Sequence, residues 1–236
     1  MSNNAGGLPH AVLSTAHPWN IGIGDVEAQW IWGRLQKSDW FEPGEDSWLV
    51  DQQLTRKRFI TGAVVSFRPR GLKEMTLGAG RVFTEMVAAT GLGAGGYFLV
   101  LLQRPLKVEL IDENNPTGED ARDQILSLFW RWAKPGNGFE SYLEWARNDH
   151  AYGIRNAVLE PEHSQGYTIG ARQAVSLSGN RVLTFQGELT HLEKPSTRLV
   201  LDYAACYAHY LVPQGYTQRG QVLGGGQRRL LRHRGP

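Results

Sequence analysis

The sequence RKRFITGAVVSF at 56–67 repeats apolar and β-branched residues at every second position. A period of two with many β-branched residues is typical of a strand that has one buried face. The sequence RPRG at 68–71 has the residues of a turn and ends this pattern. We therefore predict a strand that has Phe59, Thr61, Ala63, Val65 and Phe67 on one side.

Further apolar runs predict additional strands. The sequence YFLVLLQRPLKVELI at 97–111 indicates two buried strands that separate near Arg104 and Pro105. Residues 153–160 and 181–192 also have strand character and are bounded by turn-rich segments. Two segments remain open, because residues 139–147 fit a strand or a helix and residues 84–91 fit a short helix ended by Gly91.

Two segments show helical spacing. Thr117 and Asp120 have the spacing of a capping box, and Pro135 stops the run, so we predict a packed helix over about 118–133. Its apolar positions are Ala121, Ile125, Leu128, Phe129 and Trp132. A second helix is predicted over about 198–211, with one face formed by Leu199, Tyr203, Cys206, Tyr207, Tyr210 and Leu211.

The predicted strands outnumber the helices and do not alternate with them regularly. This pattern favours an α+β fold with a β-rich sandwich or barrel over a doubly wound parallel sheet. We expect three parts: a tryptophan-rich N-terminal extension over 1–54, a β-rich core over 55–195, and a C-terminal helix with a basic tail over 196–236.

Composition indicates a folded protein of ordinary polarity. Hydrophobic residues make up 41% of the 236 residues and charged residues 20%, and the net charge is +2. A single cysteine excludes an internal disulfide framework. The longest apolar run, 97–102, is far shorter than the ~20 residues of a membrane-spanning helix, and the N-terminus lacks a signal-peptide pattern. We therefore expect a soluble chain that makes no membrane contact.

The sequence around each chemical motif does not support a cofactor or metal site there. Gly91, Gly93 and Gly96 match a dinucleotide fingerprint, but a strand-like segment follows them where a helix is required. The seven histidines lack the spacing of metal ligands. We predict no catalytic, cofactor-binding or metal-binding residues. A hydrolase remains the weakest alternative, and its candidate groups are Asp149, His150, Glu160, Glu162 and His163.

Both ends of the chain carry residues that are common at protein interfaces. Large aromatic side chains and arginines dominate the binding energy of many interfaces. The interface candidates are Trp19, Trp30, Trp32, Trp40, Trp48, Arg228, Arg229, Arg232 and Arg234. The arginine-rich tail alone also supports a second hypothesis, a nucleic-acid-binding adaptor.

Residues 120–194 resemble structural proteins at the tail-tube and baseplate junction of long-tailed bacteriophages. The resemblance rests on the order of DARDQILSLFWRWA, FESYLEWARN, YGIRNAVLEPEHS and RVLTFQGELTHLEK. It implies a non-enzymatic virion subunit that is assembled in the host cytoplasm into a ring, most often a hexamer. Its implied partners are other copies of the chain, other tail or baseplate proteins, and DNA passing through the channel.

Overall fold

The computed structural model describes residues 7–36, 58–87, 94–102, 122–148, 165–179, 181–192, 216–219 and 221–222. Long antiparallel strands dominate these residues and form one sheet. The strands of the sheet are β1 (His10–Ser14), β2 (Trp19–Asn20), β3 (Gly24–Leu35), β4 (Arg58–Pro69), β5 (Met75–Met86), β6 (Arg122–Lys134), β7 (Phe139–Asn148), β8 (Gln165–Leu177) and β9 (Arg181–His191).

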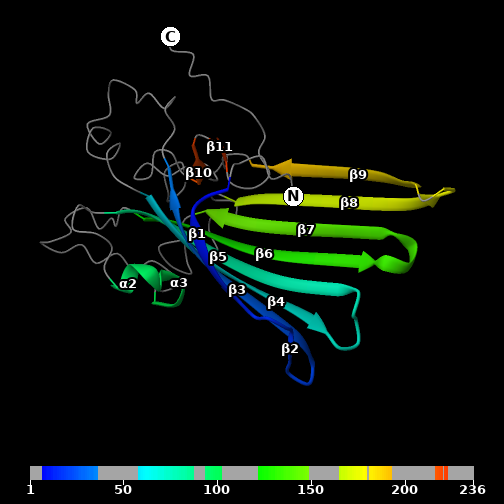
Figure 1. Ribbon diagram of the computed structural model, residues 1–236, viewed down its shortest axis with the longest axis horizontal. Coiled ribbons are helices and arrows are strands. Elements are labelled where there is room, and N and C mark those ends of the chain that lie inside the picture. The colour runs from blue at the N-terminus through cyan, green and yellow to red at the C-terminus, as the bar shows by residue number, and fades with distance from the viewer. Residues whose placement is uncertain are drawn as a thin grey trace, which may run out of the picture.

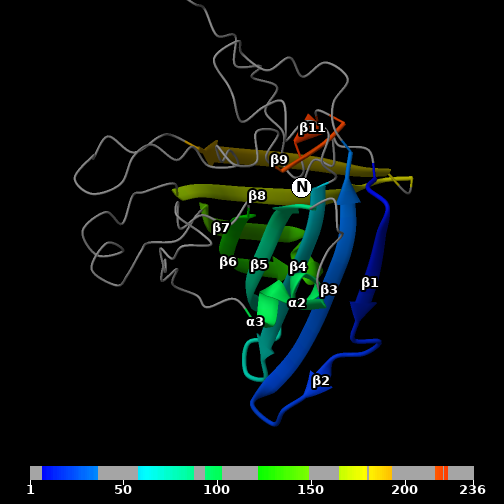
Figure 2. The ribbon, with the colours of Figure 1, turned by 90° about the vertical axis from the view of Figure 1, so that its left-hand side faces the viewer.

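The sheet is a meander in which neighbours in sequence are neighbours in space. The strand order is β1-β3-β4-β5-β6-β7-β8-β9, and β2 pairs with one end of β3. Figures 1 and 2 show this succession as a twisted surface. Three smaller elements lie beside it: the single-turn helices α2 (Ala94–Tyr97) and α3 (Leu99–Leu102), and a two-stranded hairpin of β10 (Thr217–Gln218) and β11 (Gln221–Val222). A 3-10 turn, η1 (Pro135–Asn137), connects β6 to β7.

The predicted α+β fold with a packed helix is wrong. Strands account for 74% of the described structure and helices for 7%, with no described helix of seven residues or more. The predicted helix over 118–133 corresponds to β6. Its sequence places apolar residues on both faces of the strand, with Ile125 and Phe129 on one and Leu128 and Trp132 on the other. Because both faces are apolar, the i, i+3, i+4, i+7 spacing of a helix arises by coincidence.

The remaining element predictions have mixed outcomes. The strands predicted over 56–67 and 181–192 are confirmed as β4 and β9, and the ambiguous segment 139–147 is a strand, β7. The first of the two strands predicted within 97–111 is wrong, because residues 99–102 form α3. Thr84 belongs to β5 and begins no helix. The predicted strand 153–160 and the predicted helix 198–211 lie outside the described residues.

Part of the predicted N-terminal extension belongs to the sheet. Residues 10–35 form β1, β2 and β3, and β3 pairs with β4 along its whole length, from Gly24 opposite Pro69 to Leu35 opposite Arg58. Trp30 and Trp32 are therefore strand residues. The register of β3 against β4 fixes the face of the sheet to which each side chain points.

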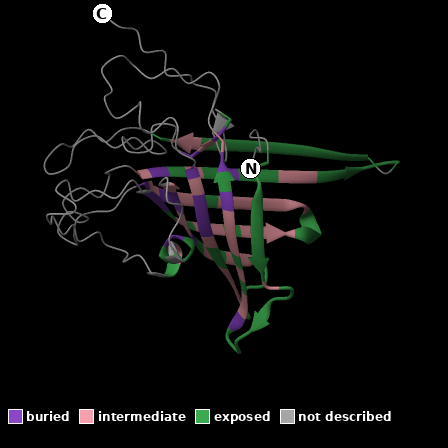
Figure 3. Cartoon of the chain, turned by 60° about the vertical axis from the view of Figure 1, so that its left-hand side comes forward, coloured by how far each residue is buried: buried purple, intermediate pink, exposed green. Residues whose placement is uncertain are grey.

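A small core forms at one end of the strands. It contains Leu35, Ile60, Ile125, Ala146 and Tyr216, with Leu8 and Val82 packed against them. Figure 3 shows most of the buried positions at this end, whereas β9 is exposed along most of its length. Most of the sheet surface thus lies outside the core.

β10 is held at this end by polar contacts. Gln36 donates its backbone N–H to Oε1 of Gln218 over 2.8 Å. The Arg58 guanidinium donates to the carbonyl oxygens of Gln36, at 2.9 Å, and Thr217, at 3.1 Å. Burial lowers the pKa of Arg58 to about 10, so the group remains cationic at neutral pH. Carbonyl groups of two segments that are distant in sequence thus contact this charge.

A glycine on β8 allows the close approach of an aromatic ring. A Cβ atom added at Gly170 would overlap the Tyr142 ring, whereas one added at Gly187 would meet no atom within 4 Å. We expect Gly170→Ala to lower the free energy of unfolding by about 1 kcal/mol, the lower end of the cost of overpacking, because the outer end of the Tyr142 ring can shift, and Gly187→Ala to change it little. Urea denaturation followed by tryptophan fluorescence measures both. Equal effects of the two substitutions would contradict this packing.

Candidate functional site: the apolar face of the sheet

One face of the sheet carries a row of apolar side chains that crosses eight strands. Residues directly opposite each other in antiparallel strands point to the same face. The strand registers therefore align a central row that consists of Trp19, Val26, Phe67, Leu77, Trp130, Leu143, Ile169 and Leu189. Leu143 is 40% exposed, Ile169 49% and Leu189 64%. This row is thus largely uncovered on β7, β8 and β9.

Two further rows adjoin the central row on the same face. Toward the core end lie Ala28, Val65, Ala79, Leu128, Trp145, Tyr167 and His191. Toward the other end lie Gly24, Pro69, Met75, Trp132, Ser141, Ala171 and Gly187. The central and adjoining rows contain no Asp, Glu, Lys or Arg among these paired residues. We call the three rows together the apolar face.

Aromatic and cationic residues border the apolar face on both sides. On the core side, the next row contains Trp30, Arg81, Leu126 and Arg147. On the far side, it contains Lys134, Phe139, Gln173 and Phe185. The Lys134 ammonium lies 4.5 Å from the centre of the Trp132 ring, a cation–π contact. The polarity of this face therefore changes within one row at each border.

Three tryptophans on this side of the sheet, Trp30, Trp132 and Trp145, have their indole N–H groups paired within the protein. Trp30 donates to Thr61 Oγ1 over 3.0 Å, and Trp145 donates to Gln165 Oε1 over 3.0 Å. Trp132 donates to Glu74 Oε2 over 3.2 Å. An indole whose donor is paired leaves its ring free to contact an apolar environment without losing a hydrogen bond.

The opposite face, which we call the polar face, carries ion pairs between neighbouring strands. Glu140 on β7 lies between two arginines: its Oε1 is 2.8 Å from Arg131 Nε on β6, and its Oε2 is 2.7 Å from Arg172 Nη2 on β8. The hydrogen bond from Arg131 and the charges of both arginines hold the pKa of Glu140 below its usual range. Glu27 and Arg68 form another cross-strand pair, at 3.6 Å.

Other polar side chains continue this face toward β9. The Tyr142 hydroxyl donates to Oε2 of Glu188, and this bond raises the pKa of Tyr142. Glu144 is more enclosed, and burial raises its pKa although a hydrogen bond with Ser127 acts in the opposite direction. Apart from the core at one end, this face thus carries charged side chains that the three rows of the apolar face lack.

The pKa shifts of Glu140 and Glu144, both on β7, predict opposite effects of pH on the free energy of unfolding. The depressed pKa of Glu140 adds stability above the unfolded pKa of ~4.3, and this stability is lost as the pH falls through the lower folded value. Burial raises the pKa of Glu144 in the folded protein, so its ionised carboxylate lowers the stability of the fold at pH values above that pKa. We expect Glu140→Gln to destabilise at neutral pH, with a deficit that shrinks on acidification, and Glu144→Gln to stabilise. The midpoints of urea denaturation from neutral to acidic pH test this, and parallel pH profiles would contradict it.

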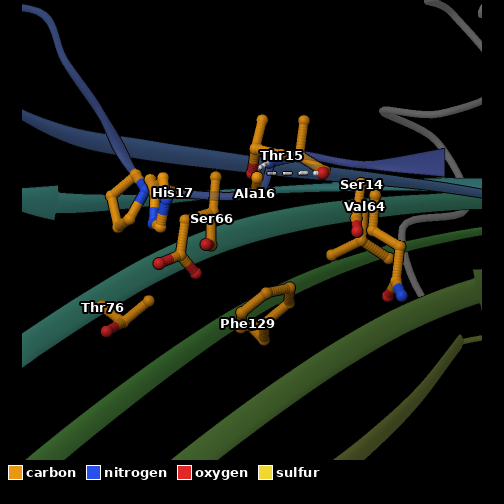
Figure 4. Close-up of a pocket in the computed structure, with 12 residues that line it drawn as sticks. Ser14, Thr15, Ala16, His17, Val64, Ser66, Thr76 and Phe129 are labelled. Carbon is orange, nitrogen blue, oxygen red and sulfur yellow. Dashed lines mark hydrogen bonds between the residues drawn. The ribbon is translucent and has the colours of Figure 1, made fainter.

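A pocket of about 440 Å³ lies between the segment that follows β1 and the polar face. Figure 4 shows Thr15, Ala16 and His17 above Ser66 of β4, Thr76 of β5 and Phe129 of β6. Its ionisable lining residues are His17 and Glu27. The pocket therefore offers a few hydrogen-bonding groups around one aromatic ring.

Three of the interface candidates predicted from sequence lie on the side of the sheet that carries the apolar face. Trp19 belongs to the central row, Trp30 to the bordering row, and Trp32 stacks on Trp30 with 5.0 Å between ring centres. The remaining candidates, Trp40, Trp48, Arg228, Arg229, Arg232 and Arg234, lie outside the described residues. So do the hydrolase candidates Asp149, His150, Glu160, Glu162 and His163.

Sequence reasoning missed Leu143, Ile169 and Leu189. Their signal was the period of two in each strand, which places every second residue on one face. In β8 the alternate residues Tyr167, Ile169 and Ala171 carry this signal, but only the registers show that they align with apolar positions of other strands.

The described segments contain no helix long and apolar enough to cross a membrane. They also contain no group of three or more His, Cys, Asp or Glu residues that could hold a metal ion. No protein-family model matches the sequence, and the comparisons with curated proteins and with solved structures return no match. The interpretation of the site therefore rests on its own geometry.

Proposed function

We propose that the protein is embedded in a lipid membrane, with the apolar face of its sheet against the hydrocarbon, the polar face toward water, and the two edges of the sheet paired with neighbouring copies, since hydrocarbon offers no partner to open backbone groups. The observation that carries this proposal is the central row, which presents apolar side chains on eight strands while Ile169 and Leu189 remain about half exposed or more. A soluble protein rarely leaves so wide an apolar surface in contact with water. The proposal departs from the expectation of a chain without membrane contact.

The height of the apolar region supports this environment. Successive rows lie two residues apart, which is about 6.7 Å along a strand. Three apolar rows and one mixed row on either side span four such steps, or roughly 27 Å. Membrane-embedded sheets present an apolar band of ~25 Å to lipid. Measured along the strands, the distance between the two bordering rows therefore approaches the height of this band, and the three apolar rows cover the inner ~13 Å of it.

The border residues support it as well. Tryptophan and tyrosine favour the boundary between hydrocarbon and water, and long cationic side chains extend from that boundary to the headgroups. Trp30 and Arg81 occupy one border, and Lys134 and Phe139 occupy the other, where the Lys134 ammonium lies over the ring of Trp132. The charged residues of the polar face, such as Glu140 between its two arginines, suit an aqueous surface.

A second candidate is the bacteriophage tail or baseplate subunit that the sequence resemblance implies. The same apolar face favours it, because neighbouring protein subunits of a ring would cover this surface as effectively as lipid does. The two candidates differ in what buries Ile169: acyl chains in the first case, and protein in the second.

Vesicle flotation separates the two candidates. We expect the full chain, folded in a mild detergent and mixed with phosphatidylcholine vesicles, to float with the vesicles after detergent removal and to resist extraction by alkaline carbonate. A chain that stays at the bottom of the gradient as a homogeneous, lipid-free ring in mass photometry would overturn the membrane proposal in favour of the tail subunit. A lipid-free monomer would overturn both.

A further inference from the structure

Residues 94–102 lie beside the apolar face, over the core-side ends of β3, β4 and β5. Figures 1 and 2 show α2 and α3 at this position, and α3 contacts β4 and β5. The sequence of the segment, AGGYFLVLL, contains no charged residue. Its location places it just outside the bordering row that contains Trp30 and Arg81.

Two side chains of the sheet hold the backbone of this segment. Trp32 donates its indole N–H to the carbonyl oxygen of Tyr97 over 2.8 Å. Arg81 donates from Nη1 to the carbonyl oxygen of Val100 over 3.1 Å. These bonds satisfy carbonyl groups that such short helices leave without an internal partner. The position of the segment is therefore fixed by donors of the sheet.

Aromatic contacts add to these hydrogen bonds. The Tyr97 ring packs edge to face against Phe59, with 5.4 Å between ring centres, and the Phe98 ring packs against Trp30 in the same manner at 5.8 Å. Both rings nevertheless remain partly uncovered. Tyr97 is 44% exposed, Phe98 47% and Leu101 69%.

An uncharged segment that is held by its backbone and exposes three large apolar side chains is suited to a boundary between two solvents. The exposed side chains gain from burial, whereas the tyrosine hydroxyl and the nearby Arg81 favour polar surroundings. The rows contacted by the segment continue the apolar face toward the core end of the strands. The headgroups of a lipid layer that covers the apolar face would therefore lie at the level of this segment.

We infer that residues 94–102 form an interfacial anchor that inserts Tyr97, Phe98 and Leu101 into the headgroup and upper acyl region of the bilayer. This inference rests on the proposed membrane function. It adds which region of the bilayer this segment contacts and how deeply its side chains insert. It also orients the protein, because the anchor marks the level at which the core end of the strands leaves the membrane.

Depth-dependent fluorescence quenching tests the anchor. Three single-cysteine variants of the full chain, Leu101→Cys, Ile169→Cys and Thr184→Cys, are made in a Cys206→Ser background and labelled with an environment-sensitive fluorophore. Phosphatidylcholine vesicles carry a nitroxide quencher either near the headgroup or near the acyl-chain end. We expect a shallow-to-deep quenching ratio above one at position 101 and below one at position 169. Thr184, an exposed residue of the polar face, serves as the unquenched control.

The outcomes separate this inference from the function on which it rests. Deep quenching at position 169 without quenching at position 101 would overturn the anchor and leave the membrane proposal standing. Stronger deep than shallow quenching at position 101 would also overturn it, since the segment would then lie in the hydrocarbon. Absence of quenching at both positions would overturn the membrane proposal itself.

Discussion

An Ile169→Lys variant is expected to bind phosphatidylcholine vesicles between about thirty-fold and several-hundred-fold more weakly than the unmodified protein. Ile169 lies in the central row and is 49% exposed, so the substitution places an ammonium group near the middle of the apolar region without disturbing a buried contact. A lysine on the lipid-facing side costs ~2–4 kcal/mol at the bilayer midplane, and each 1.4 kcal/mol is a factor of about ten. Vesicle titration with flotation measures the loss.

Thr184→Lys is the matched control for this substitution. Thr184 lies on β9, the neighbouring strand, is exposed, and points to the polar face. The same charge added there should change vesicle binding by less than a few-fold. Equal losses in the two variants would mean that the two faces of the sheet do not meet different solvents.

The second large effect concerns stability. Phe83 is 2% exposed and ranks among the largest fully buried side chains, with the Arg81 guanidinium 4.7 Å from its ring centre. Phe83→Ala should lower the free energy of unfolding by ~3–5 kcal/mol, because it removes buried apolar surface and leaves a cavity. Urea denaturation of the detergent-folded protein, followed by tryptophan fluorescence, measures the change.

Phe185→Ala provides the comparison for Phe83→Ala. Phe185 is 61% exposed and lies in the row that borders the apolar face. We expect its loss to change the unfolding free energy in detergent by less than about 1 kcal/mol. Similar costs at the two positions would show that the sheet does not have a single core end.

The strands differ in how clearly their sequences predict them. β4 is predictable because β-branched and aromatic residues recur on one side in a period of two, from Phe59 to Phe67, and a turn sequence follows. β6 is not, because Ile125 contributes to the core on one face while Leu128 belongs to the apolar face on the other. A strand that is apolar on both faces has no clear period, and the helical alternative then fits equally well.

The residues of the candidate site also differ in how clearly the sequence predicts them. The abundance of tryptophan near the N-terminus indicates an interaction surface, and Trp19 and Trp30 do lie on the side of the sheet that carries the apolar face. The continuity of that face depends on pairings such as Leu143 with Ile169, between strands separated by undescribed residues. Local sequence patterns contain no information about such alignment, which arises from the register of the whole sheet.

The meander has a consequence for how the protein folds. From β3 onward, each long strand pairs with the next long strand in the chain, so no pairing has to wait for a strand from a remote part of the sequence. The entropy lost on closing each connection grows only slowly with its length, and low contact order favours rapid folding. The sheet can therefore assemble one hairpin at a time in the order of synthesis, and each added hairpin extends the edge on which the following strand forms.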